Sequence, residues 1–204
     1  MRKMAVYSRV PLEECWKKTK RKPIQLRWVD TRKSSGEVRS RLVAKEFKNS
    51  IRPELFAATP PLEALKMILS LVASAQISRK CWEECIWAEN RHTAGGEGYG
   101  KEAWADNAIG ILHTDVARAY FHAPSREDKF VYLPPEDWQP GDEDQCCRLN
   151  VSLYGTRDAA KNWEQAYVNV LTPLGFVRGK ASPCIFRHRE RALRVIVHGD
   201  DFVA

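Results

Sequence analysis

Two adjacent carboxylates, Asp200 and Asp201, follow a glycine near the end of the sequence. The apolar runs Val195–Val197 and Phe202–Val203 flank them, which predicts a tight turn between two strands. Neighbouring negative charges repel each other, and a hard divalent cation such as Mg²⁺, which prefers oxygen ligands, would offset that repulsion. The alternative is an exposed polar turn, because Gly and Asp are common turn residues.

A third carboxylate, Asp115, lies in a second apolar strand candidate, 109–117. A carboxylate in such a strand needs a partner or a metal ion. If this strand lies beside the Asp200–Asp201 hairpin, three carboxylates converge and can hold two Mg²⁺ ions roughly 3.5–4 Å apart for phosphoryl transfer. The alternative is an Asp that caps a turn at the strand end. Together, the two features favour a two-metal site.

Further motifs surround these carboxylates in a fixed order along the chain, and Asp115 itself begins the pattern Asp-x-x-x-Ala-Tyr-Phe. The others are Arg41-Leu42-Val43-Ala44-Lys45-x-Phe47, Val131-Tyr132-Leu133-x-Pro135, Ser152-Leu153-Tyr154-Gly155 with Ala159 and Trp163, Leu174-Gly175-Phe176, and Ser182-Pro183-Cys184-Ile185-Phe186. In this order they resemble the motifs of copia-type LTR retrotransposon reverse transcriptases, which are parts of a Pol polyprotein. The likeness covers roughly residues 26–204.

The resemblance implies an RNA-directed DNA polymerase that joins a deoxynucleotide to a primer 3′-OH. Its catalytic, metal-binding residues would be Asp115, Asp200 and Asp201, with the backbone carbonyl of Val116 as a further ligand of two Mg²⁺ ions, for which Mn²⁺ could substitute. The implied partners are an RNA or DNA template with its primer, deoxynucleoside triphosphates, and the integrase and RNase H regions of a full-length element.

The resemblance also implies a set of nucleotide-binding residues. Tyr120 would exclude a ribose 2′-OH, although it could instead be a half-buried core aromatic. Basic residues of the 38–47 strand would face the triphosphate or the template, because guanidinium groups bind phosphate bidentately; a merely solvated strand is the alternative. The residues concerned are Tyr120, Arg41, Lys45, Tyr154 and Gly155, and Arg39 is a further candidate.

Some positions depart from the family pattern. His198 and Gly199 stand where an aromatic and an apolar residue usually precede the Asp pair, and 156–160 lacks the usual Gln and Pro. Few residues follow Asp201, so we expect a fragment or a degenerate copy with weak or no activity of its own. A non-catalytic nucleic-acid-binding remnant and a Gly-Asp-Asp RNA polymerase are the competing hypotheses.

The charge is unevenly distributed along the chain. The net charge is +7, yet residues 1–52 hold 16 Lys/Arg against 5 Asp/Glu, which suggests a surface that meets polyanions. No apolar run reaches the roughly 18 residues of a membrane span, and no signal peptide is evident. We therefore expect an intracellular protein of the cytoplasm or nucleus, neither secreted nor bound to membranes. The six cysteines are expected to be reduced thiols, with only weak support for a metal at Cys81, Cys85 and His92.

The elements that would position these residues follow a mixed α+β order, expected to form an antiparallel palm sheet packed on helices with partial fingers. We expect a poorly ordered basic arm over 1–23 and one fingers/palm domain over 24–204, with a flexible Gly-rich insertion at about 89–107. Predicted strands are 26–30, 38–47, 109–117, 130–133, 184–187 and 193–197, with another from Phe202. Predicted helices run from 59–61 to about 76 and from Asp158 to Gly175.

Overall fold

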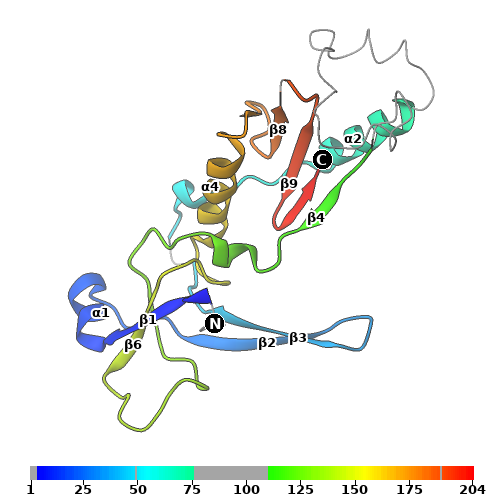
Figure 1. Ribbon diagram of the computed structural model, residues 1–204. Coiled ribbons are helices and arrows are strands. Elements are labelled where there is room, and N and C mark those ends of the chain that lie inside the picture. Colours follow the sequence, from blue (N-terminus) through cyan, green and yellow to red (C-terminus); the bar gives the residue numbers. More distant parts are fainter. Residues whose placement is uncertain (1–3, 49, 76–109, 189) are drawn as a thin grey trace. The chain divides into compact units, whose positions relative to one another are not determined.

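The computed structural model describes residues 4–48, 50–75, 110–188 and 190–204 (Figure 1). The predicted Gly-rich insertion and the Cys81, Cys85 and His92 group lie outside these residues. The chain divides into two compact units. Unit 1 comprises residues 1–57 and 118–167, and unit 2 comprises residues 58–117 and 168–204. Helices and antiparallel sheets occur together, which confirms the α+β class.

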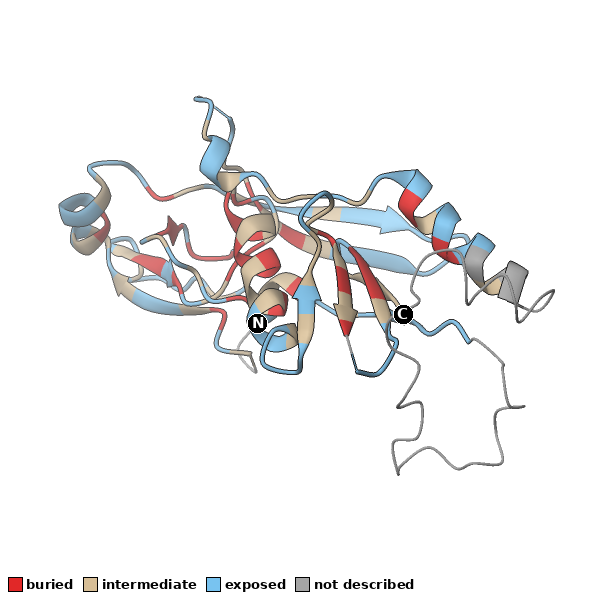
Figure 2. Cartoon of the chain, turned by 90° about the horizontal axis from the view of Figure 1, so that it is seen from above, coloured by how far each residue is buried: buried red, intermediate tan, exposed pale blue. Residues whose placement is uncertain are grey.

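Unit 1 contains a three-stranded antiparallel sheet in the order β1-β6-β5. Its strands are β1 (Tyr7–Pro11), β5 (Phe130–Val131) and β6 (Gln145–Leu149). Its core is built from buried apolar side chains of these strands and the segments beside them (Figure 2). The main contributors are Val6, Ala44, Val131, Leu133, Cys147, Leu149 and Leu153.

Within the described residues 4–23, a strand and a helix stand where a loose basic arm was predicted over 1–23. Helix α1 (Leu12–Thr19) follows β1 and buries Cys15 against Phe130 and Cys146. Two salt bridges at i,i+4 spacing, Glu13–Lys17 and Glu14–Lys18, lie along it. Lys17 and Lys18 therefore lie on a helix that packs its apolar side against the sheet.

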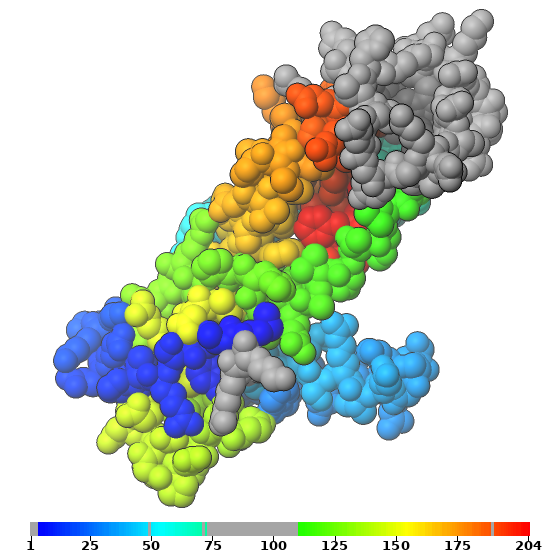
Figure 3. Space-filling model, viewed as in Figure 1, coloured from blue at the N-terminus to red at the C-terminus, as the bar shows by residue number. Residues whose placement is uncertain are grey.

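A β-hairpin forms the second sheet of unit 1 and projects from the rest of that unit (Figures 1 and 3). It joins β2 (Leu26–Arg32) to β3 (Val38–Ala44), with a turn at Gly36 that has a φ of +88°. The hairpin was predicted correctly, although β3 ends at Ala44 rather than at Phe47. Short 3₁₀ turns follow at η2 (Pro53–Leu55) and η3 (Ala119–His122).

Helix α4 (Ala159–Leu171) begins directly after Asp158, as predicted. Trp163 and Tyr167 are buried and lie edge to face, with ring centroids 5.7 Å apart. Val170, three residues after Tyr167, is 61% exposed. The buried stripe therefore does not extend into the last turn of the helix.

Unit 2 contains a five-stranded antiparallel sheet in the order β4-β10-β9-β8-β7. Its strands are β4 (His113–Asp115), β7 (Phe176–Arg178), β8 (Ile185–His188), β9 (Arg194–His198) and β10 (Asp201–Val203). Helix α2 (Leu62–Ala75) packs Ala64 and Ile68 against Ile185 and Ile196 of the sheet. Strand β4 is shorter than the predicted 109–117 strand, of which residue 109 lies outside the described part.

The four cysteines in the described part of the chain are all buried free thiols, as expected: Cys15, Cys146, Cys147 and Cys184. Burial is the main reason that the pKa of Cys146 rises to about 11 and that of Cys147 to about 12. Both thiols therefore stay protonated at neutral pH. Among the described residues, no helix is long and apolar enough to cross a membrane.

Candidate active site and nucleotide-binding surface

The Asp200–Asp201 pair lies at the turn between β9 and β10, as predicted. His198 and Asp201 are directly opposite each other, so Gly199 and Asp200 form a two-residue loop. Gly199 has a φ of +66°, whereas Asp200 has no positive φ, which matches a type II′ hairpin turn with glycine at its first central position. No atom would lie within 4 Å of a Cβ at position 199, so backbone conformation alone favours glycine there.

Strand β4 lies beside this hairpin and brings the third carboxylate to it. Asp115 is directly opposite Asp201, and the Val116 amide donates a 2.8 Å hydrogen bond to the Asp200 carbonyl oxygen. Directly opposed residues project from the same sheet face, with Cβ atoms about 4.5–5.5 Å apart. The predicted adjacency of the two strands is thereby confirmed, and Asp115 and Asp201 share one sheet face.

His113 lies on this sheet face as well and was not among the predicted site residues. Its Nε2 lies 3.0 Å from Oδ1 of Asp201. It stands two residues before Asp115 on the same strand, so both side chains project from the same face. That spacing was the available signal, but it becomes informative only once β10 is known to pair with β4.

The donor chemistry of this face fits a hard divalent cation, because Asp115, Asp200 and Asp201 supply carboxylate oxygens. Asp115 is exposed and Asp201 is half-buried, so a solvated ion could reach both. In the described residues, no group of three or more His, Cys, Asp or Glu side chains is arranged to hold a metal ion. The backbone register thus brings two of the three carboxylate positions face to face without forming a closed ligand cluster.

The residues predicted to bind the nucleotide lie in unit 1. Tyr120 and Tyr154 pack together, with ring centroids 4.8 Å apart. The Tyr154 carbonyl oxygen accepts a 2.7 Å hydrogen bond from the Ala44 amide. Gly155 has a φ of +84°, and a Cβ there would lie 2.1 Å from the Ala44 carbonyl oxygen. The Tyr154–Gly155 turn is therefore docked tightly on the end of β3.

Three arginines share one face of the β2–β3 hairpin. Arg39 is opposite Thr31, Arg41 is opposite Val29, and Arg27 is opposite Val43. Because side chains alternate along a strand, all three guanidinium groups project from the same face, and no acidic residue of either strand joins them. Arg27 was missed because only the register reveals it. Lys45 follows β3, and its amide donates a 2.8 Å hydrogen bond to the Gln25 carbonyl oxygen.

A buried ionic cluster, absent from the sequence predictions, connects the end of β3 to the turn after Gly155. Lys129 is only 5% exposed, and its Nζ lies 2.8 and 2.9 Å from the two Glu46 carboxylate oxygens. It also lies 3.2 Å from Glu127 and 3.4 Å from Asp158. Burial alone would lower the Lys129 pKa, but the Glu46 hydrogen bond and the surrounding carboxylates raise it. Glu46 also accepts a 2.8 Å bond from the Arg157 amide.

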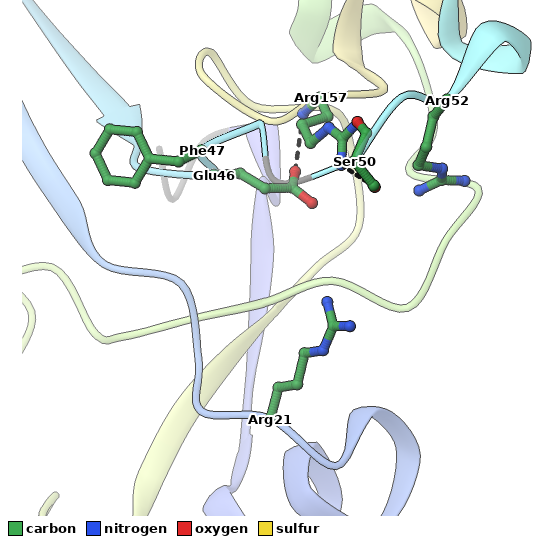
Figure 4. Close-up of a pocket in the computed structure, with 6 residues that line it drawn as sticks. All are labelled: Arg21, Glu46, Phe47, Ser50, Arg52 and Arg157. Carbon is green, nitrogen blue, oxygen red and sulfur yellow. Dashed lines mark hydrogen bonds between the residues drawn. The ribbon is translucent and has the colours of Figure 1, made fainter.

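A cavity of about 460 Å³ lies next to this cluster in unit 1 (Figure 4). The Arg157 guanidinium donates to the Ser50 carbonyl oxygen at 2.6 Å and to its hydroxyl at 3.3 Å. Arg52 donates to Glu127 and Glu54, and these hydrogen bonds lower the pKa of both carboxyls. The lining residues are Arg21, Glu46, Phe47, Ser50, Arg52 and Arg157.

Comparison with known proteins agrees with the motif series. A family model described as "Reverse transcriptase (RNA-dependent DNA polymerase)" matches residues 103–204. The retrovirus-related Pol polyprotein from transposon TNT 1-94 of Nicotiana tabacum is 22% identical over 177 residues, covering 83% of this chain and 11% of that protein. The transposon Ty1-BL Gag-Pol polyprotein of Saccharomyces cerevisiae is 28% identical over 99 residues, which cover 48% of this chain and 5% of that protein. The chain thus spans a small part of these relatives, and no solved structure matches it.

Proposed function

The chain belongs to the reverse transcriptase (RNA-dependent DNA polymerase) family of copia-type retrotransposons, and on this premise we propose that it forms the palm and fingers of an RNA-directed DNA polymerase. It would add deoxynucleotides to a primer 3′-OH on an RNA or DNA template. The observation that carries the proposal is the register of β4 and β10, which sets Asp115 directly opposite Asp201 next to the Asp200 turn.

The three carboxylates, with the Val116 carbonyl, would hold two Mg²⁺ ions, or Mn²⁺ in their place. When bound, such ions lower the pKa of the attacking hydroxyl and stabilise the charge of the leaving pyrophosphate. The chain's own contribution is to bring carboxylates from two paired strands to one exposed face. His113 holds one oxygen of Asp201, which fixes the orientation of that carboxylate.

Tyr120 and the Tyr154–Gly155 turn would form the surface on which the incoming nucleotide rests. The packing of Tyr120 on Tyr154 supports a fixed ring position, as exclusion of a ribose 2′-OH requires. Arg41 and Lys45 would meet the triphosphate or template phosphates, and Arg27 and Arg39 extend that basic face. Binding of nucleic acid should therefore weaken steeply as salt concentration rises.

Primer extension tests this proposal directly. A version of the domain extended through the downstream region of its element should elongate oligo(dT) on poly(rA) with Mg²⁺, whereas the 204-residue chain should show weak or no extension. Asp115→Asn and Asp200→Asn should each abolish extension, while Asp144→Asn, an exposed control with the same charge change, should not. Undiminished extension by the Asp115 variant would refute the site assignment.

A second candidate is a non-catalytic nucleic-acid-binding remnant, which the basic hairpin face favours. It would retain salt-dependent binding of oligonucleotides while the extended version incorporates no nucleotide. A Gly-Asp-Asp RNA polymerase is a third candidate, suggested by Gly199, and would incorporate ribonucleotides in preference to deoxynucleotides. The first proposal also includes integrase and RNase H regions of the same polyprotein as partners. It places the protein in cytoplasmic virus-like particles or in the nucleus.

A further inference from the structure

We propose that the three arginines on one face of the β2–β3 hairpin bind successive phosphates of one unpaired nucleic-acid strand, the part of the template that is still to be copied. This inference rests on the proposed function and deepens it, because it assigns the arginine face to the template strand rather than to the triphosphate. In spatial order the three residues, the arginine row, are Arg27, Arg41 and Arg39.

The spacing of the arginine row follows from the strand register. Arg39 and Arg41 are two residues apart on β3, so their Cα atoms lie about 6.8 Å apart. Arg27 is opposite Val43, which makes it the diagonal neighbour of Arg41 at about 7–8 Å. The row is therefore roughly 14 Å long, in two nearly equal steps. Successive phosphates of an extended strand are separated by a similar step, whereas the three phosphates of a nucleoside triphosphate share bridging oxygens and span much less.

The positive charge of the arginine row is not compensated within the hairpin. Two of its members are exposed and the third, Arg41, is half-buried. In the described part of the chain, no carboxylate lies within ion-pair distance of the row. The two acidic residues of the hairpin are placed elsewhere, because Asp30 lies on the other face and Glu37 pairs with Lys33 beside the turn at 2.8 Å. The row is therefore a face of one sign of charge.

The arginine row begins beside the surface proposed for the incoming nucleotide. Val43, which is opposite Arg27 at one end of the row, lies so close to Gly155 that a Cβ there would be 2.5 Å from its Cγ1. The Ala44 amide binds the Tyr154 carbonyl oxygen at the same end of β3. From there the row continues toward the tip of the hairpin, which projects from the rest of unit 1 (Figures 1 and 3). A strand with one base at the Tyr154–Gly155 turn would carry its next nucleotides along the row.

The shape of the hairpin favours a single strand over a duplex. Paired β-strands are only about 4.7–4.9 Å apart, so the hairpin is a narrow ribbon that one flexible strand can follow. A duplex is a stiff rod whose backbone winds around its axis, and its phosphates would leave a nearly straight row. The template that awaits copying is unpaired, and phosphate contacts carry no sequence information, so the row suits a template of any sequence.

Fluorescence anisotropy of the 204-residue chain with labelled single-stranded oligo(rU) in EDTA tests the proposal in the absence of metal ions and catalysis. Arg27→Ala and Arg39→Ala should each weaken binding roughly fivefold and reduce the slope of log K against log salt concentration by about 0.7, the contribution of one single-strand phosphate. The double variant should reduce the slope by about 1.4. Arg39→Lys keeps the charge and should restore the slope.

Arg32→Ala is the matched control, because Arg32 is exposed on the opposite face of the same hairpin and its loss gives the same change in net charge. Affinity should change less than about twofold in this variant. If Arg27→Ala and Arg39→Ala behave as this control does while the wild type binds, the row makes no contact with the strand and the inference is wrong.

Two further ligands test the identity of the bound phosphates. If the row variants weaken binding of a blunt RNA–DNA duplex of the same length as much as binding of the single strand, the assignment to an unpaired strand is wrong. If they lose affinity for thymidine triphosphate but not for oligo(rU), the row belongs to the incoming nucleotide. The two proposals fail separately, because primer extension and its loss in Asp115→Asn test the polymerase, whereas strand binding in EDTA tests only the row.

Discussion

The two units treat their carboxylates in opposite ways. In unit 1, Glu46, Glu127 and Asp158 surround the buried Lys129, and each carboxylate lies within 3.4 Å of its ammonium group. In unit 2, Asp115 and Asp201 lie opposite each other on an exposed sheet face, and the polar contact found for them is that between His113 and Asp201. The carboxylates of the first group share a buried cation, and Glu127 has Arg52 as a second one, whereas the repulsion within the second group is left largely in place.

This difference separates a structural role from a functional one. A compensated buried cluster stabilises only the fold, because none of its members is available to a ligand without loss of a partner. An exposed acidic face costs stability and gains from an added cation. The comparison therefore predicts that substitutions in the unit 1 cluster reduce stability, whereas those on the unit 2 face change ligand response.

Lys129→Met should have the largest effect on stability. Removing the buried ammonium takes the cation away from Glu46 and Asp158, while Glu127 keeps Arg52, and breaking a buried ion cluster in this way costs about 3–5 kcal/mol. Urea denaturation followed by circular dichroism measures the loss. Lys17→Met, which removes a largely exposed cation from α1, should cost less than about 1 kcal/mol. Equal losses in the two variants would contradict the distinction between the units.

Gly155→Ala and Gly199→Ala compare two glycines that both have positive φ. At position 155 the added Cβ would overlap the Ala44 carbonyl oxygen and Val43, so backbone strain and steric overlap combine to cost about 3 kcal/mol. At position 199 the space is open, and only the backbone term of about 1 kcal/mol remains. Thermal unfolding of both variants measures which substitution costs more stability. A larger loss of stability at position 199 than at position 155 would contradict this interpretation.

The ion pairs of unit 1 should make stability depend on pH at both extremes. Hydrogen bonds from Arg52 lower the pKa of Glu54 and Glu127, so their contribution exists above the unfolded value near 4.5 and is lost as pH falls through the folded pKa. The raised pKa of Lys129 gives a contribution present below 10.5 and lost as pH rises through the folded pKa. The melting temperature should fall at both acid and alkaline pH. Arg52→Ala should make the fall at acid pH smaller.

Asp115→Asn should have the smallest effect on stability, and in the opposite direction. Like charges directly opposite on neighbouring strands destabilise a sheet, so relief of the repulsion should add about 0.2–1 kcal/mol in EDTA. Addition of Mn²⁺ should raise the melting temperature of the wild type, because a ligand stabilises the state that binds it, and should raise that of the variant less. An equal response to Mn²⁺ would place the ion elsewhere.

Local sequence patterns predicted the elements that depend on local signals. The turn at Gly199 follows from a glycine between two apolar runs, and the hairpin around Gly36 follows from a Ser-Ser-Gly stretch between strands. Helix α2 begins at Leu62, directly after a proline pair that favours a helix start. The motif order then indicated the family that the comparisons support.

The features that the sequence did not predict depend on distant partners. Strand β1 pairs with β6, far along the chain, so nothing within 1–23 indicated an ordered region. Lys129 has no local pattern that distinguishes it from a surface lysine, because its three carboxylates come from separate segments. His113 and Arg27 gain their significance only through strand register.

The pairing of β1 with β6 also constrains how the protein can be made. Tyr7 is aligned with Leu149, so β1 has no partner until residues 145–149 have also left the ribosome. At typical elongation rates of roughly 5–20 residues per second, that interval lasts on the order of ten seconds. During it an unpaired strand edge is exposed to neighbouring nascent chains, and chaperone occupancy of the emerging N-terminal segment should decide the yield of folded unit 1.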